Sequence, residues 1–275
     1  MSKPITQHRI KCPKCGTRKT WKITALSRRR CSKCRHTFTP KIGGIIISKK
    51  LLLKILEDFI LGLSTDQLLE RHPAIKKHRL LKITQIARIT MTNDIPKIFS
   101  GTVEVDETYM GGQWKNKRLR TKKTEPKSKR GKGTTKQAIF GILCRRDEVY
   151  VQLITGAKKK DLQPIIEKRV SKGSTVCSDS WGGYTGIATK GFVHRTVDHG
   201  KQEYSDLKGG HINGLEGFWG YLKRNLVSRG GIRKSRLKYF LGEYMWRYNH
   251  KKLSIKEQTT LLFNLIVKLK LGVRY

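Results

Sequence analysis

The chain has 275 residues, with 60 Lys and Arg against 20 Asp and Glu, so its formal net charge is +40 and its pI is near 10.4. Such a charge destabilises the compact state by self-repulsion unless a polyanion relieves it, so nucleic acid is the expected partner. The ordered apolar pattern argues against a basic ribosomal protein, and the lack of an amphipathic anchor or signal-like start argues against a membrane-surface protein. The longest apolar stretches, 51–63 and 261–271, are interrupted by charged or amide side chains and are not expected to span a bilayer.

Four of the six cysteines form two CxxC pairs, Cys12 with Cys15 and Cys31 with Cys34. Each pair turns two thiolates towards one point, and two pairs complete the tetrahedral four-sulfur shell of a Zn²⁺ ion. Four thiolates leave no open position, so this zinc is expected to be structural. Residues 1–45 are therefore predicted to form a basic zinc ribbon that contacts DNA phosphates. Free thiols and a metal are typical of a reducing compartment, which indicates a cytoplasmic protein, associated with the nucleoid when DNA-bound.

Residues 46–97 carry helical periodicity and are predicted to form a helical DNA-binding region. An apolar helix over Leu51–Leu61 is followed by a short helix that Ser64 and Gln67 begin with a capping box. A basic helix over Ile75–Thr90 comes next, and the order favours a helix-turn-helix as much as a helical spacer. The basic side chains available to a DNA groove are Lys76, Lys77, Arg79 and Arg88.

The segment GTVEVDETYMGG, residues 101–112, is unusually acidic for this chain. Glu104, Asp106 and Glu107 fall within four residues, and valines alternate with the first two of these acids. Period-two alternation predicts a half-buried strand, and Asp106 is expected near its exit. A solvated strand edge or a bound divalent cation would account for the acids.

The segment 113–136 contains eleven Lys or Arg and one acid. Its glycines and Pro126 exclude a stable helix, so a long basic loop that becomes ordered on DNA is predicted, in preference to a solvated insertion. The loop residues expected to bind DNA are Lys115, Lys117, Arg118, Arg120, Lys122, Lys123, Lys129 and Arg130.

The segment 98–275 is predicted to be an α/β domain. The strands expected after the acidic one are Ala138–Leu143, Val149–Ile154, 175–178 ending at Asp179, and Val193–Val197. The expected helices are Asp161–Val170, His211–Arg229, Ser235–Asn249 and Lys256–Lys270. Three consecutive strands followed by alternating helices and strands predict a mixed sheet with helices on its faces. Cys144 and Cys177 fall inside strands and are expected in the core.

The acids of this domain are expected to meet. Asp106 and Asp179 end strands that can lie side by side. Two carboxylates at such a short distance repel each other unless a cation neutralises them. On the helix that follows, Asn213, Glu216 and Lys223 share one face. These oxygen ligands suit Mg²⁺ or Mn²⁺, and two such ions can assist an in-line phosphoryl displacement. Alternatively, Asp179 caps a helix and Glu216 forms a salt bridge with a neighbouring base.

The segments VEVDETYMGG, SDSWGGY, HINGLEGFWGYLKR and EYMWRYNHK resemble, in order, the motifs of an insertion-sequence transposase group related to the eukaryotic Merlin elements. The resemblance covers the chain from Cys12 to about His250. It implies an N-terminal zinc ribbon and an RNase-H-like domain of a DDE-type transposase, which cuts element ends and joins them to target DNA. Terminal inverted repeats and target DNA would be the partners, bound by a homodimer or a larger synaptic complex because two ends must be cut together.

The resemblance also assigns roles to residues. Asp106 and Asp179 match the first two catalytic acids, and either Asn213 or Glu216 matches the third, with Glu216 favoured because a carboxylate is the stronger ligand. Lys223 matches a basic residue that grips an end phosphate, and Arg224 beside it is also expected to bind DNA. Trp219 matches an aromatic residue expected to pack. Two other functions remain open: a non-catalytic zinc-ribbon regulator (or decayed transposase), and an RNase-H-like nuclease without strand transfer.

Overall fold

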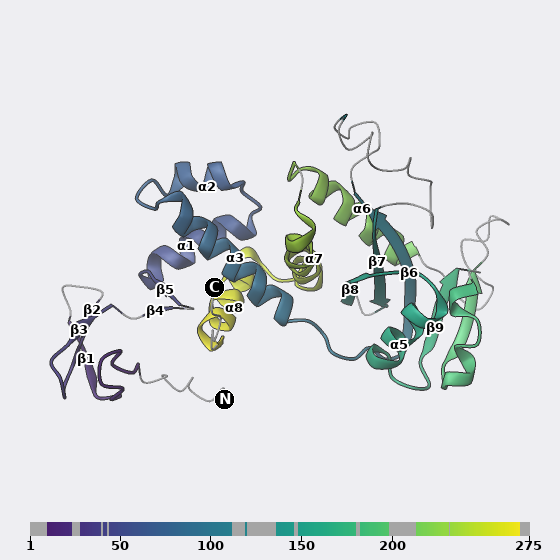
Figure 1. Ribbon diagram of the computed structural model, residues 1–275, viewed down its shortest axis with the longest axis horizontal. Coiled ribbons are helices and arrows are strands. Elements are labelled where there is room, and N and C mark those ends of the chain that lie inside the picture. The colour runs from purple at the N-terminus through teal and green to yellow at the C-terminus, as the bar shows by residue number, and fades with distance from the viewer. Residues whose placement is uncertain are drawn as a thin grey trace. The chain divides into compact units, whose positions relative to one another are not determined.

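The computed structural model describes residues 10–23, 28–39, 41–42, 44–111, 119, 136–145, 148–179, 182–197, 213–230 and 232–269. The chain forms two compact units, one made of Met1–Thr90 with Leu253–Tyr275 and the other of Met91–Lys252 (Figure 1). Across the described ranges, every helix lacks the length or the hydropathy that a bilayer crossing requires.

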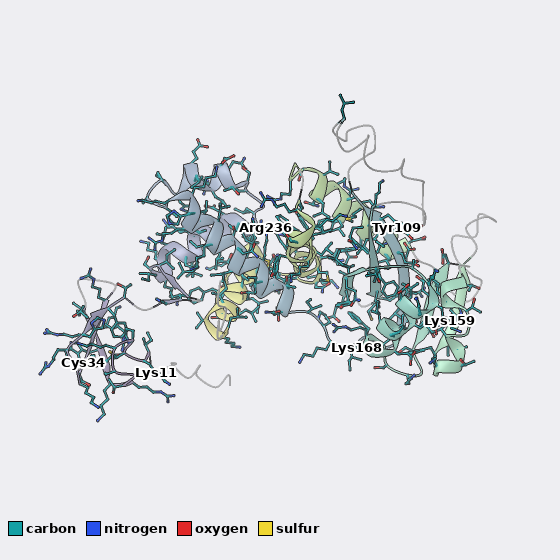
Figure 2. The ribbon with its side chains drawn as sticks, viewed as in Figure 1. Lys11, Cys34, Tyr109, Lys159, Lys168 and Arg236 are labelled. Carbon is teal, nitrogen blue, oxygen red and sulfur yellow. The ribbon has the colours of Figure 1, made fainter. Side chains whose placement is uncertain are left out.

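The N-terminal part of the first unit is a small ribbon. Its strands β1 (Thr20–Ile23), β2 (Arg28–Cys31) and β3 (Thr37–Phe38) form an antiparallel sheet in that order. A short hairpin of β4 (Lys41–Ile42) and β5 (Ile45–Ile46) follows. Figure 2 shows Lys11 and Cys34 on this ribbon. The prediction of a ribbon at the start of the chain is confirmed.

Four helices make up the rest of the first unit. They are α1 (Lys49–Ile60), α2 (Thr65–Arg71), α3 (Lys77–Asn93) and α8 (Ile255–Lys268), and the unit takes in most of α3. The capping box is confirmed, because the Gln67 backbone N–H donates to Ser64 Oγ and the Gln67 side chain accepts from the Ser64 N–H. Asp58 of α1 is buried and accepts hydrogen bonds from Arg71 and His72, which ties the end of α2 to α1.

The position of α8 differs from the predicted domain division, which joined this helix to the segment 98–275. In the structure α8 packs against α1, and Leu262, Phe263 and Ile266 are buried. The ammonium of Lys49, the first residue of α1, lies 5.4 Å from the centre of the Phe263 ring. Hydrophobic burial drives this pairing, and an amphipathic pattern does not specify which partner covers its apolar face.

The second unit is built on a five-stranded mixed sheet. Its strands are β6 (Thr102–Met110), β7 (Gln137–Cys144), β8 (Glu148–Ile154), β9 (Thr175–Asp179) and β10 (Val193–Val197), in the spatial order β10-β9-β6-β7-β8. The first three form an antiparallel meander, and β9 and β10 run parallel to β6. Three antiparallel strands followed by two parallel ones on the other side of the first strand are the RNase-H-like topology, as predicted.

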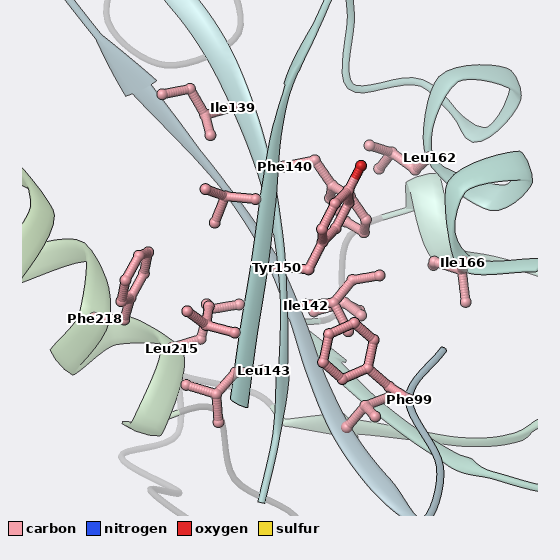
Figure 3. Close-up of a cluster of buried hydrophobic side chains, with 14 of the residues drawn as sticks. Phe99, Ile139, Phe140, Ile142, Leu143, Tyr150, Leu162, Ile166, Leu215 and Phe218 are labelled. Carbon is pink, nitrogen blue, oxygen red and sulfur yellow. The ribbon is translucent and has the colours of Figure 1, made fainter. Parts of the chain in front are cut away.

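Helices cover both faces of this sheet. Figure 3 shows Leu215 and Phe218 of α6 (Asn213–Val227) on one side and Leu162 and Ile166 of α5 (Lys159–Arg169) on the other. All four side chains are fully buried, and they form one core with the apolar side chains of β6 and β7. Cys144 and Cys177 are buried in strands as predicted.

The outer edge of β8 is closed by α7 (Lys234–Asn249). The Asn249 side-chain amide accepts from the Val149 backbone N–H at 2.8 Å and donates to the Val149 carbonyl at 3.0 Å. Met245 Sδ accepts from the Val151 N–H at 2.9 Å. These contacts occupy backbone groups that an edge strand otherwise leaves open to non-native pairing. Met245 and Asn249 of the EYMWRYNHK segment therefore have a structural role at the edge of the sheet.

Candidate active site

Asp106 and Asp179 lie on neighbouring parallel strands. Thr102, Val103 and Glu104 of β6 are opposite Thr175, Val176 and Cys177 of β9. Two residues further on, the same register makes Asp106 level with Asp179, the last residue of β9. Adjacent strands are about 4.8 Å apart and side chains at one level point to the same face, so the register brings Asp106 and Asp179 to neighbouring positions.

The predicted position of Asp106 within its own strand is wrong. β6 continues four residues beyond it, to Met110, because the meander pairing with β7 extends from Val103 to Met110. Asp106 therefore lies in the middle of β6, level with the last residue of β9.

α6 crosses the sheet face that carries Asp106. The indole Nε1 of Trp219 donates to Asp106 Oδ2 at 2.9 Å, and the Trp219 side chain is buried. Glu216 precedes Trp219 by about one turn and Lys223 follows it by about one turn, and both are exposed. One side of α6 therefore carries a carboxylate, an indole N–H and an ammonium, and the indole contacts Asp106. Asn213 is exposed at the first position of the helix.

The electrostatic state of Asp106 reflects this crowding. Burial raises its pKa, and the carboxylates of Asp179 and Glu216 raise it further. Hydrogen bonds from Trp219 and from the Glu107 backbone act in the opposite direction. The carboxylates of Asp179 and Glu216 are thus close enough to Asp106 to repel its charge, and a bound cation relieves such repulsion.

Glu104 has a different partner from Asp106 on the same face. Its side chain is 1% exposed, and Oε2 accepts the backbone N–H of Leu215 at 2.9 Å. Free N–H groups at a helix N-terminus favour a carboxylate, so Glu104 caps α6 from the sheet. The approach is close at Gly214, because a Cβ there would lie 3.0 Å from Oε2 and would push the carboxylate back by a few tenths of an ångström.

Glu107 points to the opposite face of the sheet. The hydroxyl of Tyr184 donates to Glu107 Oε2 at 2.8 Å, and Tyr184 is fully buried. Burial, followed by the Glu107 charge and hydrogen bond, raises the pKa of Tyr184 well above its ordinary value. Tyr184 ends the short helix Gly182–Tyr184, shortly after Asp179. This bond therefore fastens the segment after β9 to β6.

Gly141 has a packing role beside Asp106 that was not predicted from the sequence. It lies directly opposite Asp106 in the β6–β7 pair. A Cβ at Gly141 would lie 2.7 Å from two ring carbons of Trp219 and 3.1 Å from Leu215 Cδ1. Because Gly141 has no side chain, the indole of Trp219 can lie against β7 and reach Asp106. A glycine inside a strand pattern often marks such a close approach, and that signal was present in QAIFGILC.

The four cysteines of the ribbon converge as predicted. Cys12 Sγ is 3.6 Å from Cys34 Sγ, Cys15 Sγ is 3.5 Å from Cys31 Sγ, and all four sulfurs lie within 4.8 Å of one another. Zn–S bonds of about 2.3 Å in a tetrahedron place sulfurs roughly 3.8 Å apart, so the cluster could hold zinc with little adjustment. Burial raises the pKa of Cys31, but hydrogen bonds from the Cys34 and Lys33 backbone and from Cys15 lower it to about 6 overall.

The residues predicted to bind DNA are only partly described. The eight basic residues of the segment 113–136 named above lie outside the described residues, whereas Lys223 and Arg224 are exposed on α6. In the helical region, Arg79 donates to the Ile46 carbonyl, and the Arg88 guanidinium lies 5.2 Å from the centre of the Phe59 ring. Both therefore have packing roles inside the first unit.

An RNase-H-like sheet with acids on its central strand, on the adjoining strand and on a covering helix defines the class of this unit. Residues 98–249 match the family described as ISXO2-like transposase domain, and the chain belongs to that family. The motif resemblance to insertion-sequence transposases is confirmed.

The chain is also similar to individual proteins. An uncharacterized transposase-like protein of Haemophilus influenzae is 29% identical over 119 residues, which are 43% of this chain and 94% of that protein. The structure of the Mos1 transposase paired-end complex with left transposon end is 13% identical, with a TM-score of 0.29, over 85% of this chain and 81% of that one. A pre-cleavage Mos1 transpososome is 11% identical, with a TM-score of 0.23, over 85% and 82%.

Proposed function

We propose that this transposase cleaves the ends of an insertion sequence and joins them to target DNA by divalent-metal-assisted phosphoryl transfer. The catalytic carboxylates would be Asp106, Asp179 and Glu216. The observation that carries the proposal is the β6–β9 register, which makes the two aspartates level on adjacent strands. The influence of Glu216 on the pKa of Asp106 supports including the helix in the same centre.

The donor set fits Mg²⁺ or Mn²⁺. It offers carboxylate oxygens from Asp106, Asp179 and Glu216 and an amide oxygen from Asn213, without thiolate or imidazole. The repulsion that raises the pKa of Asp106 is the feature that a divalent ion would relieve. When bound, a pair of such ions activates the attacking water or 3′-hydroxyl and stabilises the leaving oxygen.

The chain's own residues divide the remaining tasks. Asp106 and Asp179 would hold the ions from the rigid sheet, and Glu216 would close the site from α6, with Asn213 as a neutral neighbour. Glu216 is favoured over Asn213 because it carries the charge. Lys223, two turns beyond Glu216 on the same side, would contact a phosphate next to the scissile bond. Arg224 and the segment 113–136 would hold flanking or target DNA.

The other partners follow from the family and from charge. The net charge of +40 favours double-stranded DNA, here terminal inverted repeats and target DNA. A homodimer or a larger synaptic complex would allow the two element ends to be cut together. The cysteine cluster would hold a structural Zn²⁺ ion, and the helical region would help to bind the element ends. The protein would act in the cytoplasm, at the nucleoid.

The test is cleavage and strand transfer by purified protein with Mg²⁺ and a duplex carrying the terminal repeat from the DNA that flanks the gene. Asp106→Asn should abolish both reactions and leave DNA binding within about two-fold, because the change removes one charge from a strongly basic chain. The matched control is Glu167→Gln, an acid on α5 that pairs with Lys190 at 3.5 Å and should react as wild type.

Three outcomes separate the functions. Cleavage by Asp106→Asn would refute the site. Cleavage by the wild type without joining would identify a nuclease instead. Binding of the repeat with neither reaction would identify a non-catalytic regulator.

A further inference from the structure

A side chain of α6 contacts Asp106 through a hydrogen bond from a neutral group. Trp219 Nε1 lies 2.9 Å from Asp106 Oδ2, and 113 residues separate the two in sequence. The indole N–H is a donor only, so its role in this bond is fixed by chemistry. Packing alone would not require it to meet a carboxylate.

The indole of Trp219 packs against the backbone of β7, which keeps it in this position. Gly141 lies opposite Asp106 on β7, and a methyl group there would sit 2.7 Å from the six-membered ring of Trp219. The ring therefore lies in direct contact with the strand backbone, beside the carboxylate it donates to. With an exposed fraction of 4%, the side chain has little freedom to adopt another rotamer.

A second bond fixes the same helix one turn earlier. Glu104 Oε2 accepts the backbone N–H of Leu215 at 2.9 Å. Glu104 and Asp106 point to the same face of β6, and their partners on α6 are four residues apart. The two bonds resist both rotation and sliding of α6 against β6. Glu216 lies between them in sequence, so its placement relative to Asp106 depends on both.

We infer that Trp219 is a positioning residue for divalent-metal binding, which holds one oxygen of Asp106 and fixes the direction of the remaining lone pairs. A carboxylate has about four acceptor sites, and the indole occupies one of them. Because the donor is uncharged, it orients the carboxylate without adding a positive charge that would repel the metal ion. This role rests on the proposed function, since it requires Asp106 to be a metal ligand.

The experiment removes the N–H and keeps the ring. Trp219 is replaced by 3-benzothienylalanine, in which sulfur stands for the indole N–H, and in parallel by Phe. The controls are Phe218→Leu, which alters the neighbouring buried ring that meets Tyr248 edge-on, and Asp106→Asn. Mn²⁺ is titrated into zinc-saturated protein and free Mn²⁺ is read by electron paramagnetic resonance. Thermal unfolding is recorded for each variant, so that a folding defect is recognised.

Loss of a group that orients a metal ligand typically weakens metal affinity 10–100-fold. The 3-benzothienylalanine and Phe proteins should weaken Mn²⁺ binding by that factor, and the sulfur analogue should keep the unfolding temperature of the wild type. Phe218→Leu should lower the unfolding temperature and leave Mn²⁺ affinity unchanged. Raising the Mn²⁺ concentration should restore cleavage by the sulfur analogue, which a purely structural role would not produce.

Wild-type affinity for Mn²⁺ in the sulfur analogue would overturn the inference, because the ring would then only fill space. The Asp106→Asn protein separates this failure from failure of the proposed function. If Asp106→Asn weakens Mn²⁺ binding while the sulfur analogue does not, the proposed function is still supported and the positioning role of Trp219 is refuted. If Asp106→Asn binds Mn²⁺ as the wild type does, both are overturned.

Discussion

Gly141→Ala is the change that most sharply tests the packing around Asp106. In a strand interior, alanine is ordinarily favoured over glycine by about 0.5–1 kcal/mol because glycine loses more backbone entropy on folding. At this position the new methyl group meets two ring carbons of Trp219 at 2.7 Å and Leu215 Cδ1 at 3.1 Å. The sign of the stability change therefore reports whether the indole occupies that space.

The expected magnitude follows from these distances. Carbon atoms pack at about 3.5–4.0 Å, so the ring would have to retreat by nearly 1 Å. The ring is buried and its N–H is bonded to Asp106, so such a shift also stretches that hydrogen bond. Overpacking of this kind costs about 1–3 kcal/mol, and each kcal/mol lowers the unfolding temperature of a unit this size by about 2–4 °C.

The assay is urea denaturation followed by circular dichroism, together with end cleavage. The matched control is Gly217→Ala on α6, where a Cβ meets nothing within 4 Å. That substitution should stabilise the protein by up to about 1 kcal/mol because alanine is the better helix former. If Gly141→Ala also stabilises the protein and retains full cleavage, the described packing of Trp219 against β7 is refuted.

Three further changes test other parts of the molecule. Glu243 is fully buried and its Oε1 accepts from Arg247 Nη2 at 2.8 Å, so Glu243→Gln should lower the urea-derived stability by about 3–5 kcal/mol, and an unchanged midpoint would contradict this buried pair. Cys31→Ser should abolish bound zinc by metal analysis and leave the melting of the unit Met91–Lys252 unaltered; retained zinc would remove the four-cysteine site. Asn249→Ala should cost about 1–3 kcal/mol, because the Val149 N–H and carbonyl lose their partner, and wild-type stability would show that water replaces the amide.

Local patterns in the sequence predicted most of the second unit. The strands β7 to β10 and the helices α5, α6 and α7 lie within three residues of the predicted ranges, because period-two and helical spacing are properties of short segments, whereas β6 runs four residues beyond the predicted end at Asp106. Asp179 ends its strand as predicted, since SWGG after it carries turn-forming residues. The cysteine spacing predicted the cluster because each CxxC is a local structure.

What could not be predicted depends on contacts between distant segments. Asp106 is level with Asp179 because of the register between β6 and β9, and this register cannot be predicted from a single sequence. The bond from Trp219 to Asp106 spans 113 residues, and the bond from Leu215 to Glu104 spans 111. The period-two alternation of a strand places Glu104 and Asp106 on one face and Glu107 on the other. A different partner for Glu107 could therefore have been predicted from the sequence.

The most direct test of the central claim is the anomalous scattering of Mn²⁺ in crystals of the protein bound to a terminal-repeat duplex. We predict a peak about 2.1–2.2 Å from carboxylate oxygens of both Asp106 and Asp179, with Glu216 or water completing the shell. The peak should disappear in Asp106→Asn crystals. Mn²⁺ bound elsewhere on the chain, with Asp106 and Asp179 outside its coordination shell, would contradict the assignment of the active site.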